Sequence, residues 1–448
     1  MHDIRQKETP LAQNFMLKSL LHFAFPTMLM MLFMGFYTFV DTVFVARFVD
    51  TNALSALNIV CPVINLLVGV GTMLATGGSA IVARKMGAGE SVRASQDFTL
   101  IICAGGLLGV LLAVLGMVFI DRIVWALGAS NVLFPYCREY LFVLLLFTPA
   151  SILQVLFQNL LVTAGRPELG MALGVSAGIT NILLDYVFMV PLQMGIKGAA
   201  LGTGIGYLIP TIAGVWFFGQ QKGSLYFRKP VLDGSVLMKS CTNGFSEMVS
   251  QAATAVTTFL FNGTMLALLG EDGVAAITIL IYTQFLLSSL YIGFSMGVAP
   301  VLSYHDGKQD REQLKSVFSL SMRFVLFASV IVFVIAFLFG PSLVQIFSEK
   351  GTSVYEIARN GFLIFSFSFL FCGLNIFISA AFTALSNGRL SACLSFLRTF
   401  GLLTALLFTL PRFWGVIGIW LAVPVAELLT MLVAVIFLVQ NRERYHYA

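Results

Sequence analysis

Twelve stretches of this chain are apolar and long enough to cross a lipid bilayer, and this feature limits the fold more than any other. We place them at about residues 19–44, 54–80, 97–120, 138–162, 168–190, 197–218, 240–268, 274–303, 316–340, 357–385, 390–410 and 415–438. A crossing needs about 20 apolar residues in a helix that satisfies its own backbone groups. Charged residues make up only 10% of the 448 residues, against about 25% in soluble domains. The sequence therefore predicts an all-α membrane protein with twelve transmembrane helices.

Several other classes of protein are disfavoured. Residues 1–15 are polar and lack the apolar run and cleavage site of a signal peptide, so the first span should be retained. The net charge of +5 belongs to membrane loops and does not indicate a nucleic-acid partner. The six cysteines form no CxxC pair, and His2, His22, His305 and His446 are scattered. We therefore expect no cofactor and no metal site apart from a sodium ion used in transport.

The basic residues are divided unequally between the two sides of the predicted membrane domain. Twelve spans place both termini on one side, and seventeen Lys and Arg residues belong to that side, against seven on the other. Loops that stay in the cytoplasm carry the excess of positive charge. We therefore expect a multi-pass protein of the plasma (inner) membrane with both termini in the cytoplasm.

The two halves of the sequence repeat each other. When the sequence is shifted by 220 residues without a gap, pairs of identical residues recur along a stretch of nearly 180 residues. Among the aligned pairs are Phe25 with Phe245, Gly77 with Gly297, Gly87 with Gly307, Thr163 with Thr383, and Pro191 with Pro411. Six spans per half, an even number, give a parallel repeat about an axis along the membrane normal, as in several transporters. We expect an N-terminal lobe (1–219), a cytoplasmic linker (220–239), a C-terminal lobe (240–448) and a binding cavity between the lobes.

Polar groups inside the first half gather at one depth. Asp41, Asp185 and Thr203 each lie six residues from the outer end of their span, which is roughly 9 Å at 1.5 Å per residue. Asn181 stacks on Asp185 one helical turn away. Glycines repeat every four residues on both of the spans that carry Asn181, Asp185 and Thr203, and such stripes let helices approach closely. We therefore expect this cluster to face neighbouring helices rather than lipid.

The cluster is absent from the second half. The 220-residue shift maps Asp41, Asn181, Asp185 and Thr203 onto Phe261, Gly401, Ala405 and Val423. A group required by the fold itself should occur in both halves, so we interpret the asymmetry as functional, although a cluster that only locks the first half remains the alternative. Met30, Met34 and Tyr37 share a helix face with Asp41 and are weaker candidates for the lining of a cavity.

A second charged set lies in the other half. Arg398 and Glu427 lie fourteen and fifteen residues from Arg412, about 21–23 Å below the outer boundary. They are expected to form an ion pair that is mainly structural, because pairing neutralises two charges that are costly in a bilayer, and a substrate site is the alternative. Pro26 removes a backbone hydrogen bond from the first span and is expected to kink it.

Three segments resemble the multidrug and toxic compound extrusion (MATE) family. They are Phe36–Arg47 (FYTFVDTVFVAR), Ala83–Glu90 (ARKMGAGE) and Asn181–Tyr186 (NILLDY). The resemblance covers the whole chain. Within the family, the sequence is most similar to the prokaryotic DinF and MepA-like branch. The resemblance implies an exporter of organic cations and drugs that exchanges them for protons or sodium ions. We also expect the protein to be a monomer.

The resemblance also implies roles for individual residues. Asp41, Asn181, Asp185 and Thr203 match the amino-terminal cation site of the family, and Pro26 matches a proline where the first helix bends in some members. Some relatives use an acid in the middle of span 7 for a second sodium site. Here span 7 has only Glu247, near its cytoplasmic end, so this site is in doubt.

Rival functions make different demands on the sequence. A flippase for lipid-linked sugars should have a cationic cavity to hold pyrophosphate, but Arg398 is the one cation predicted at mid-membrane. A membrane-embedded prenyl transferase needs clustered aspartates for magnesium, and no DDxxD run occurs. The DxxxD pattern Asp306–Asp310 falls in a short charged loop. A channel is also compatible with the spans, but a two-half repeat fits alternating access better.

The predicted topology can be tested by cysteine labelling. A single cysteine at Pro230, in the linker, should react with a membrane-impermeant maleimide only from the cytoplasmic face, because the linker belongs to the basic side. The measurement compares intact cells with inside-out vesicles. Reaction of position 230 only from outside would reject the topology.

Overall fold

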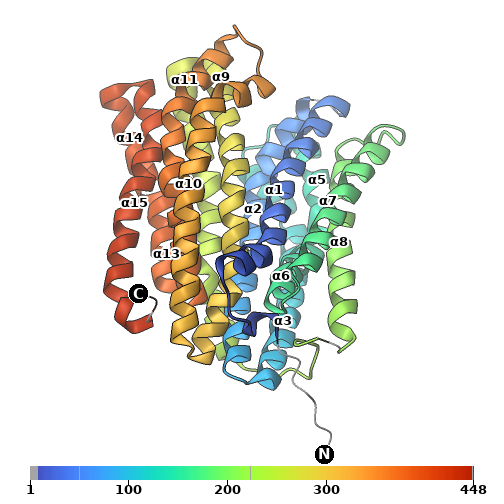
Figure 1. The fold of residues 1–448 in the computed structure, drawn as a ribbon. Helices are drawn as coiled ribbons and strands as arrows, with labels where there is room; N and C mark the ends of the chain where they lie inside the picture. The colour runs from blue at the N-terminus through green and yellow to red at the C-terminus, as the bar shows by residue number, and fades with distance from the viewer. Residues whose placement is uncertain (1–8, 50, 222, 446, 448) are drawn as a thin grey trace, which may run out of the picture.

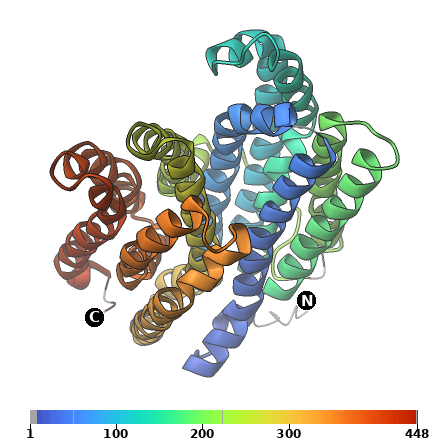
Figure 2. The same ribbon diagram turned by 90° about the horizontal axis from the view of Figure 1, so that it is seen from above.

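The computed structural model describes residues 9–49, 51–221, 223–445 and 447, and within its helices it leaves the side chains of residues 39, 41–48, 51 and 54 undescribed. The chain forms two groups of helices that lie side by side (Figures 1 and 2). The first contains η1 (Pro10–Ala12), α1 (Leu17–Phe48), α2 (Thr51–Gly87), α3 (Ser91–Val118), α4 (Ile120–Ala126), α5 (Phe134–Leu146), α6 (Thr148–Thr163), α7 (Pro167–Met189) and α8 (Ile196–Gly219). The second contains α9 (Gly234–Lys308), α10 (Arg311–Phe347), α11 (Ser353–Phe365), α12 (Phe369–Ala384), α13 (Gly388–Phe396), α14 (Leu402–Trp414) and α15 (Val416–Tyr445).

The helices account for the predicted crossings. Among the described residues, ten helices or continuous helix pairs are long and apolar enough to span a membrane, and α5 with α6, which meet at 53°, form an eleventh. Helix α9 has 75 residues, about 110 Å of helix against a bilayer core of about 30 Å. Its backbone breaks at Gly270, where φ is +67°. Counting the two arms of α9 separately gives the twelve crossings in two lobes that the sequence predicts.

Local signals explain where the elements begin and bend. The α5–α6 bend falls at Phe147, two residues before Pro149. Helix α1 runs from Leu17 to Phe48 and includes Pro26, so the kink expected at this proline stays a prediction. Helix α9 begins at Gly234 rather than at the expected residue 240, because the Asp233 carboxylate caps it by accepting a 2.9 Å hydrogen bond from the Ser235 N–H. The same hydrogen bond holds the pKa of Asp233 below its usual value.

The two lobes meet along α2 and α9, where backbones approach closely. We call the end of the bundle that holds the 220–233 connection the basic end. Toward that end, a Cβ on Gly77 would overlap the carbonyl oxygen of Ser240, and a Cβ on Gly87 would overlap that of Tyr304. Gly307 stands in the same relation to Arg84. Gly87 and Gly307 are partners in the 220-residue repeat, so the seam is itself nearly two-fold symmetric.

The buried apolar residues show where the lobes are joined. One cluster contains residues of both lobes, among them Leu74 and Val82 of α2 and Val298 and Val301 of α9. A second cluster contains only residues of the second lobe, from Phe261 onward, and a third contains only residues 53–200 of the first. The described apolar core is therefore continuous between the lobes in the basic half, whereas the other half has one core per lobe.

Substitution of a seam glycine should separate the lobes. Gly77→Val places side-chain atoms where the Ser240 carbonyl lies, and overpacking of this kind costs about 1–3 kcal/mol. We expect a lower melting temperature for the purified variant in detergent, measured by fluorescence-detected size exclusion after heating. Gly263→Val is the matched control, because a Cβ at Gly263 meets nothing within 4 Å. Equal stability of the two variants would contradict a tightly packed seam.

Candidate functional site

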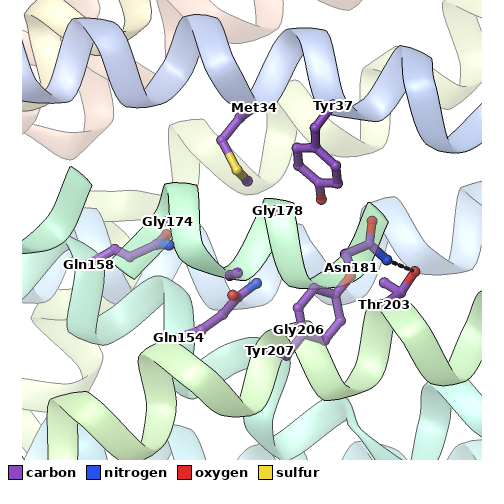
Figure 3. A pocket seen from close by; sticks show the side chains of 11 residues that line it. Met34, Tyr37, Gln154, Gln158, Gly174, Gly178, Asn181, Thr203, Gly206 and Tyr207 are labelled. Carbon is purple, nitrogen blue, oxygen red and sulfur yellow. Dashed lines mark hydrogen bonds between the residues drawn. The ribbon is translucent and has the colours of Figure 1, made fainter. Parts of the chain in front are cut away.

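A narrow polar pocket lies inside the first lobe, between α1, α6, α7 and α8 (Figure 3). Its lining combines amides, hydroxyls and a thioether: Met34, Tyr37, Gln154, Gln158, Gly174, Ala177, Gly178, Asn181, Thr203, Gly206 and Tyr207. The free space suits a water-sized species rather than a drug-sized molecule. The pocket therefore has the size and the donor atoms of an ion or proton site.

Asn181 and Thr203 form the polar centre of the pocket. Asn181 Nδ2 donates a 3.2 Å hydrogen bond to Thr203 Oγ1, and Thr203 Oγ1 donates to the Ala199 carbonyl at 3.1 Å. Asn181 Oδ1 is buried and accepts no hydrogen bond from the described part of the chain. A buried acceptor without a donor is costly, so this oxygen is suited to contact a bound cation or a proton donor.

The two predicted aspartates, Asp41 and Asp185, belong to different helices of the first lobe. Asp185 is fully buried on α7 and packs beside Gly202 of α8, where a Cβ would overlap its carboxylate. It is one turn from Asn181 and next to the pocket rather than in its lining. Asp41 belongs to α1, but its side chain lies outside the described residues.

The glycine stripes explain how the site is assembled. On α7, a Cβ at Gly174 would lie 3.0 Å from Met30 Sδ, and one at Gly178 would lie 2.6 Å from Phe33 Cε1. Close packing of α1 on α7 therefore buries Met30, which is 2% exposed. Met34 and Tyr37 line the pocket, whereas Met30 does not.

Three further lining residues were not identified from the sequence. Gln154 and Gln158 of α6 are each 7% exposed and extend toward the pocket, and Tyr207 comes from α8 (Figure 3). Two glutamines four residues apart in an apolar span were a usable signal, because buried amides need partners. Tyr207 had no such signal, since a lone tyrosine in a span is common.

The predicted charged pair forms in the second lobe. Arg398 Nε donates to Glu427 Oε1 at 2.8 Å, and Asn375 Nδ2 donates to Glu427 Oε2 at 2.7 Å. Arg398 also donates to Cys372 Sγ at 3.6 Å. Glu247 of α9, which the sequence places toward the cytoplasmic end of its span, lies close enough to Arg398 to interact with its charge. Glu427 is 4% exposed and has its charge balanced.

The pair stands where the other lobe has its pocket. The 220-residue shift relates Arg398 to Gly178 and Glu427 to Tyr207, both of which line the pocket. Arg398 lies in a π-helical turn, Leu397–Gly401, between α13 and α14. The two lobes thus have equivalent positions inside their helix bundles. In the first lobe this position is a pocket, and in the second lobe the Arg398 side chain occupies it.

A two-lobe bundle of twelve crossings with a polar pocket inside one lobe defines a membrane transporter. The MatE family model matches residues 26–187 and 248–409, one segment in each lobe. The chain belongs to the MatE family of multidrug transporters, as the sequence resemblance implied, and it is not an enzyme.

Relatives cover almost the whole chain. The multidrug export protein MepA of Staphylococcus saprophyticus is 23% identical over 437 residues, which are 95% of this chain and 94% of that protein. MepA of Staphylococcus aureus strain NCTC 8325 is 25% identical over 453 residues, with the same coverage.

Solved structures confirm the fold. A MATE family transporter in an outward-facing conformation matches with a TM-score of 0.90 at 19% identity and covers 99% of this chain and 98% of its own. An aspartate-to-asparagine variant of the Vibrio cholerae MATE transporter VcmN matches with a TM-score of 0.89 at 20% identity, over 96% and 98% of the two chains.

The role of the charged pair can be tested by breaking it and then removing it. Arg398→Ala strands the buried Glu427 carboxylate, which should cost about 3 kcal/mol of stability. Arg398→Met with Glu427→Gln removes both charges and should recover most of the folded yield. Arg412→Ala, at an exposed position near the end of α14, is the control. A stable Arg398→Ala protein that loses only the transport of cations would show that the pair is not structural.

Proposed function

We propose that this protein is a secondary active exporter that exchanges organic, mostly cationic, compounds for protons or sodium ions. It would act by alternating access in the plasma membrane, with both termini in the cytoplasm. The observation that carries the proposal is the polar pocket inside the first lobe, next to a fully buried carboxylate. Polar groups at membrane depth are costly and mark ion pathways.

In this proposal, Asp41, Asn181, Asp185 and Thr203 together form the coupling site. Asp185 supplies a buried charge, and Asn181 and Thr203 supply neutral oxygens from two helices. Oxygen donors suit a hard cation, and a buried carboxylate can take up a proton instead. Asp41 comes four residues after Tyr37, which lines the pocket, and this spacing, together with the family resemblance, supports its inclusion.

The pocket holds the ion, and the drug binds elsewhere. Its space is too narrow for an organic cation, so the substrate would bind outside it, in a cavity between the lobes that opens during the cycle. Met34 and Tyr37 of α1 line the pocket and could offer an adaptable and aromatic surface to that substrate.

The conformational cycle follows from the way the lobes are joined. Residues 1–219 and 240–448 would move as two bodies, with 220–239 as the cytoplasmic linker. The shared apolar cluster lies in the basic half and the separate clusters lie in the other half. We assign this arrangement to the state closed toward the cytoplasm. A single chain carries both lobes, so the unit is taken to be a monomer.

The rival flippase function is weaker because of how the mid-membrane cation is bonded. Arg398 is engaged by Glu427 at 2.8 Å and lies near a second carboxylate, Glu247. A guanidinium already neutralised in this way is poorly suited to hold a pyrophosphate group.

Gradient-driven efflux tests the coupling site. Asp41→Asn and Asp185→Asn should insert and fold but lower the efflux of a fluorescent cation about tenfold or more, because ion binding would no longer shift the conformational balance. Asn181→Ala should cause a milder loss. The assay uses proteoliposomes with pH and sodium gradients imposed separately, which also identifies the coupling ion.

The matched control is Asp121→Asn, an exposed aspartate paired with Arg138 and far in sequence from the pocket. It should transport like the wild type at equal protein amounts. Near-wild-type efflux by both Asp41→Asn and Asp185→Asn would reject the site and make the second lobe the candidate.

A further inference from the structure

A short segment before α1 contacts both lobes at the basic end. We call residues 9–16, which include η1, the N-terminal strap. Its side chains are strongly sorted: Leu11 is 0% and Phe15 is 2% exposed, whereas Met16 is 76% exposed. Both buried side chains belong to the apolar cluster that the two lobes share. The strap is therefore part of the core rather than a loose tail.

Toward the first lobe, the strap makes two apolar contacts. Pro10 packs on Gly165, between α6 and α7, where a Cβ would lie 2.7 Å from Pro10 Cγ. The ring of Phe15 meets the ring of Phe23 of α1 edge to face, with centroids 5.8 Å apart.

Toward the second lobe, the same Phe15 makes two further contacts. Its N–H donates a 3.3 Å hydrogen bond to Gln313 Oε1 of α10. Its ring meets the imidazole of His305, which is fully buried on α9, with centroids 6.3 Å apart and planes at 88°. Phe15 thus bridges elements of two lobes that would have to separate at this end.

The strap lies beside the other interlobe contacts of the basic end. Arg84 of α2 pairs with Asp306 of α9 at 3.1 Å, next to Gly307. The Arg84 side chain is about half exposed, and exposed pairs contribute little. Removal of water from the aromatic ring of Phe15 is the stronger attraction, because apolar burial scales with area.

We propose that the N-terminal strap is a latch that holds the basic end closed and must release Phe15 when the lobes part there. The proposal rests on the alternating-access mechanism proposed above. A strap that stays with one lobe as a passive cover is the competing outcome. A latch predicts that loss of the Phe15 contacts opens the seam, while a passive cover predicts no change at the seam.

The reporter for opening is a cysteine inside the seam. Ser240 is fully buried, and its carbonyl lies where a Cβ on Gly77 would be. Ser240→Cys can react with a water-soluble maleimide only when α2 and α9 separate, so its rate follows the open population. Five native cysteines are replaced and Cys137 is retained, because it is buried in the core of the first lobe alone and reports unfolding. Peptide mass spectrometry distinguishes the two labels.

Phe15→Ala should raise the labelling rate of position 240 about tenfold or more without raising that of Cys137, since the closed state loses a contact absent from the open one. Met16→Ala, the neighbouring exposed residue, should leave both rates unchanged. Gln313→Ala should raise the rate less, and Gln313→Glu, which keeps an acceptor oxygen, should restore it.

Equal rates in Phe15→Ala, Gln313→Ala and Met16→Ala would overturn the latch. If Phe15→Ala does not fold, the two Gln313 variants decide. Labelling is done on the purified full chain without drug or gradient, so the outcome is independent of whether the aspartate variants abolish efflux. The labelling result can therefore support the latch even if the efflux assay rejects the proposed coupling site, and the two proposals can fail independently.

Discussion

The close approach of α2 and α9 is the contact on which the arrangement of the two lobes depends. Gly77 and Gly87 on one side and Gly244 and Gly307 on the other leave no room for a side chain, so backbone lies against backbone. Inside a bilayer there is little hydrophobic drive between helices, and close packing of small residues replaces it. Among the described residues, these close backbone contacts lie in the basic half, and the remaining length of each lobe has its own core. The two lobes are therefore held together at the basic end, whereas at the other end each lobe packs around its own core.

The repeat supplies two equivalent frames, and the side chains make them unequal. In the first lobe, Gly178 and Tyr207 leave a pocket beside Asp185. In the second, Arg398 and Glu427 stand at the equivalent positions and bond to each other at 2.8 Å. The guanidinium group of Arg398 thus occupies, in the second lobe, the position that corresponds to the pocket of the first lobe. Under the proposed function, one lobe could exchange an external cation while the other stays neutralised throughout the cycle.

Much of this could be predicted from the sequence, for physical reasons. Apolar runs of bilayer length, a single 220-residue shift and the matched depths of Arg398 and Glu427 predict crossings, lobes and an ion pair, because helix rise and membrane thickness are fixed. The boundary between the two spans of α9 was predicted as well, because Gly270, where φ is +67°, falls between the expected spans 240–268 and 274–303. Gln154 and Gln158 were missed although their spacing in an apolar span was a usable signal. Tyr207 was missed because its importance depends on which helices surround it. The strap was also missed, because Leu11 and Phe15 are buried by parts of the chain far away in sequence.

Helix α1 connects all of these features. On one face, Met30 and Phe33 pack against Gly174 and Gly178 beside the pocket. On another, Thr27 and Met28 lie against Gly293 of α9, where a Cβ would be 2.6 Å from Met28 Cα. At its start, Phe23 meets Phe15 of the strap. Contacts this tight cannot stretch, so a shift of α1 on α7 must be followed at the contact of α1 with α9 or break it. Under the proposed function, a cation that bound between α7 and α8 and drew α1 toward it would therefore alter the contact of α1 with α9 and the strap together, which is how occupancy of a small pocket could decide which end of the transporter is open.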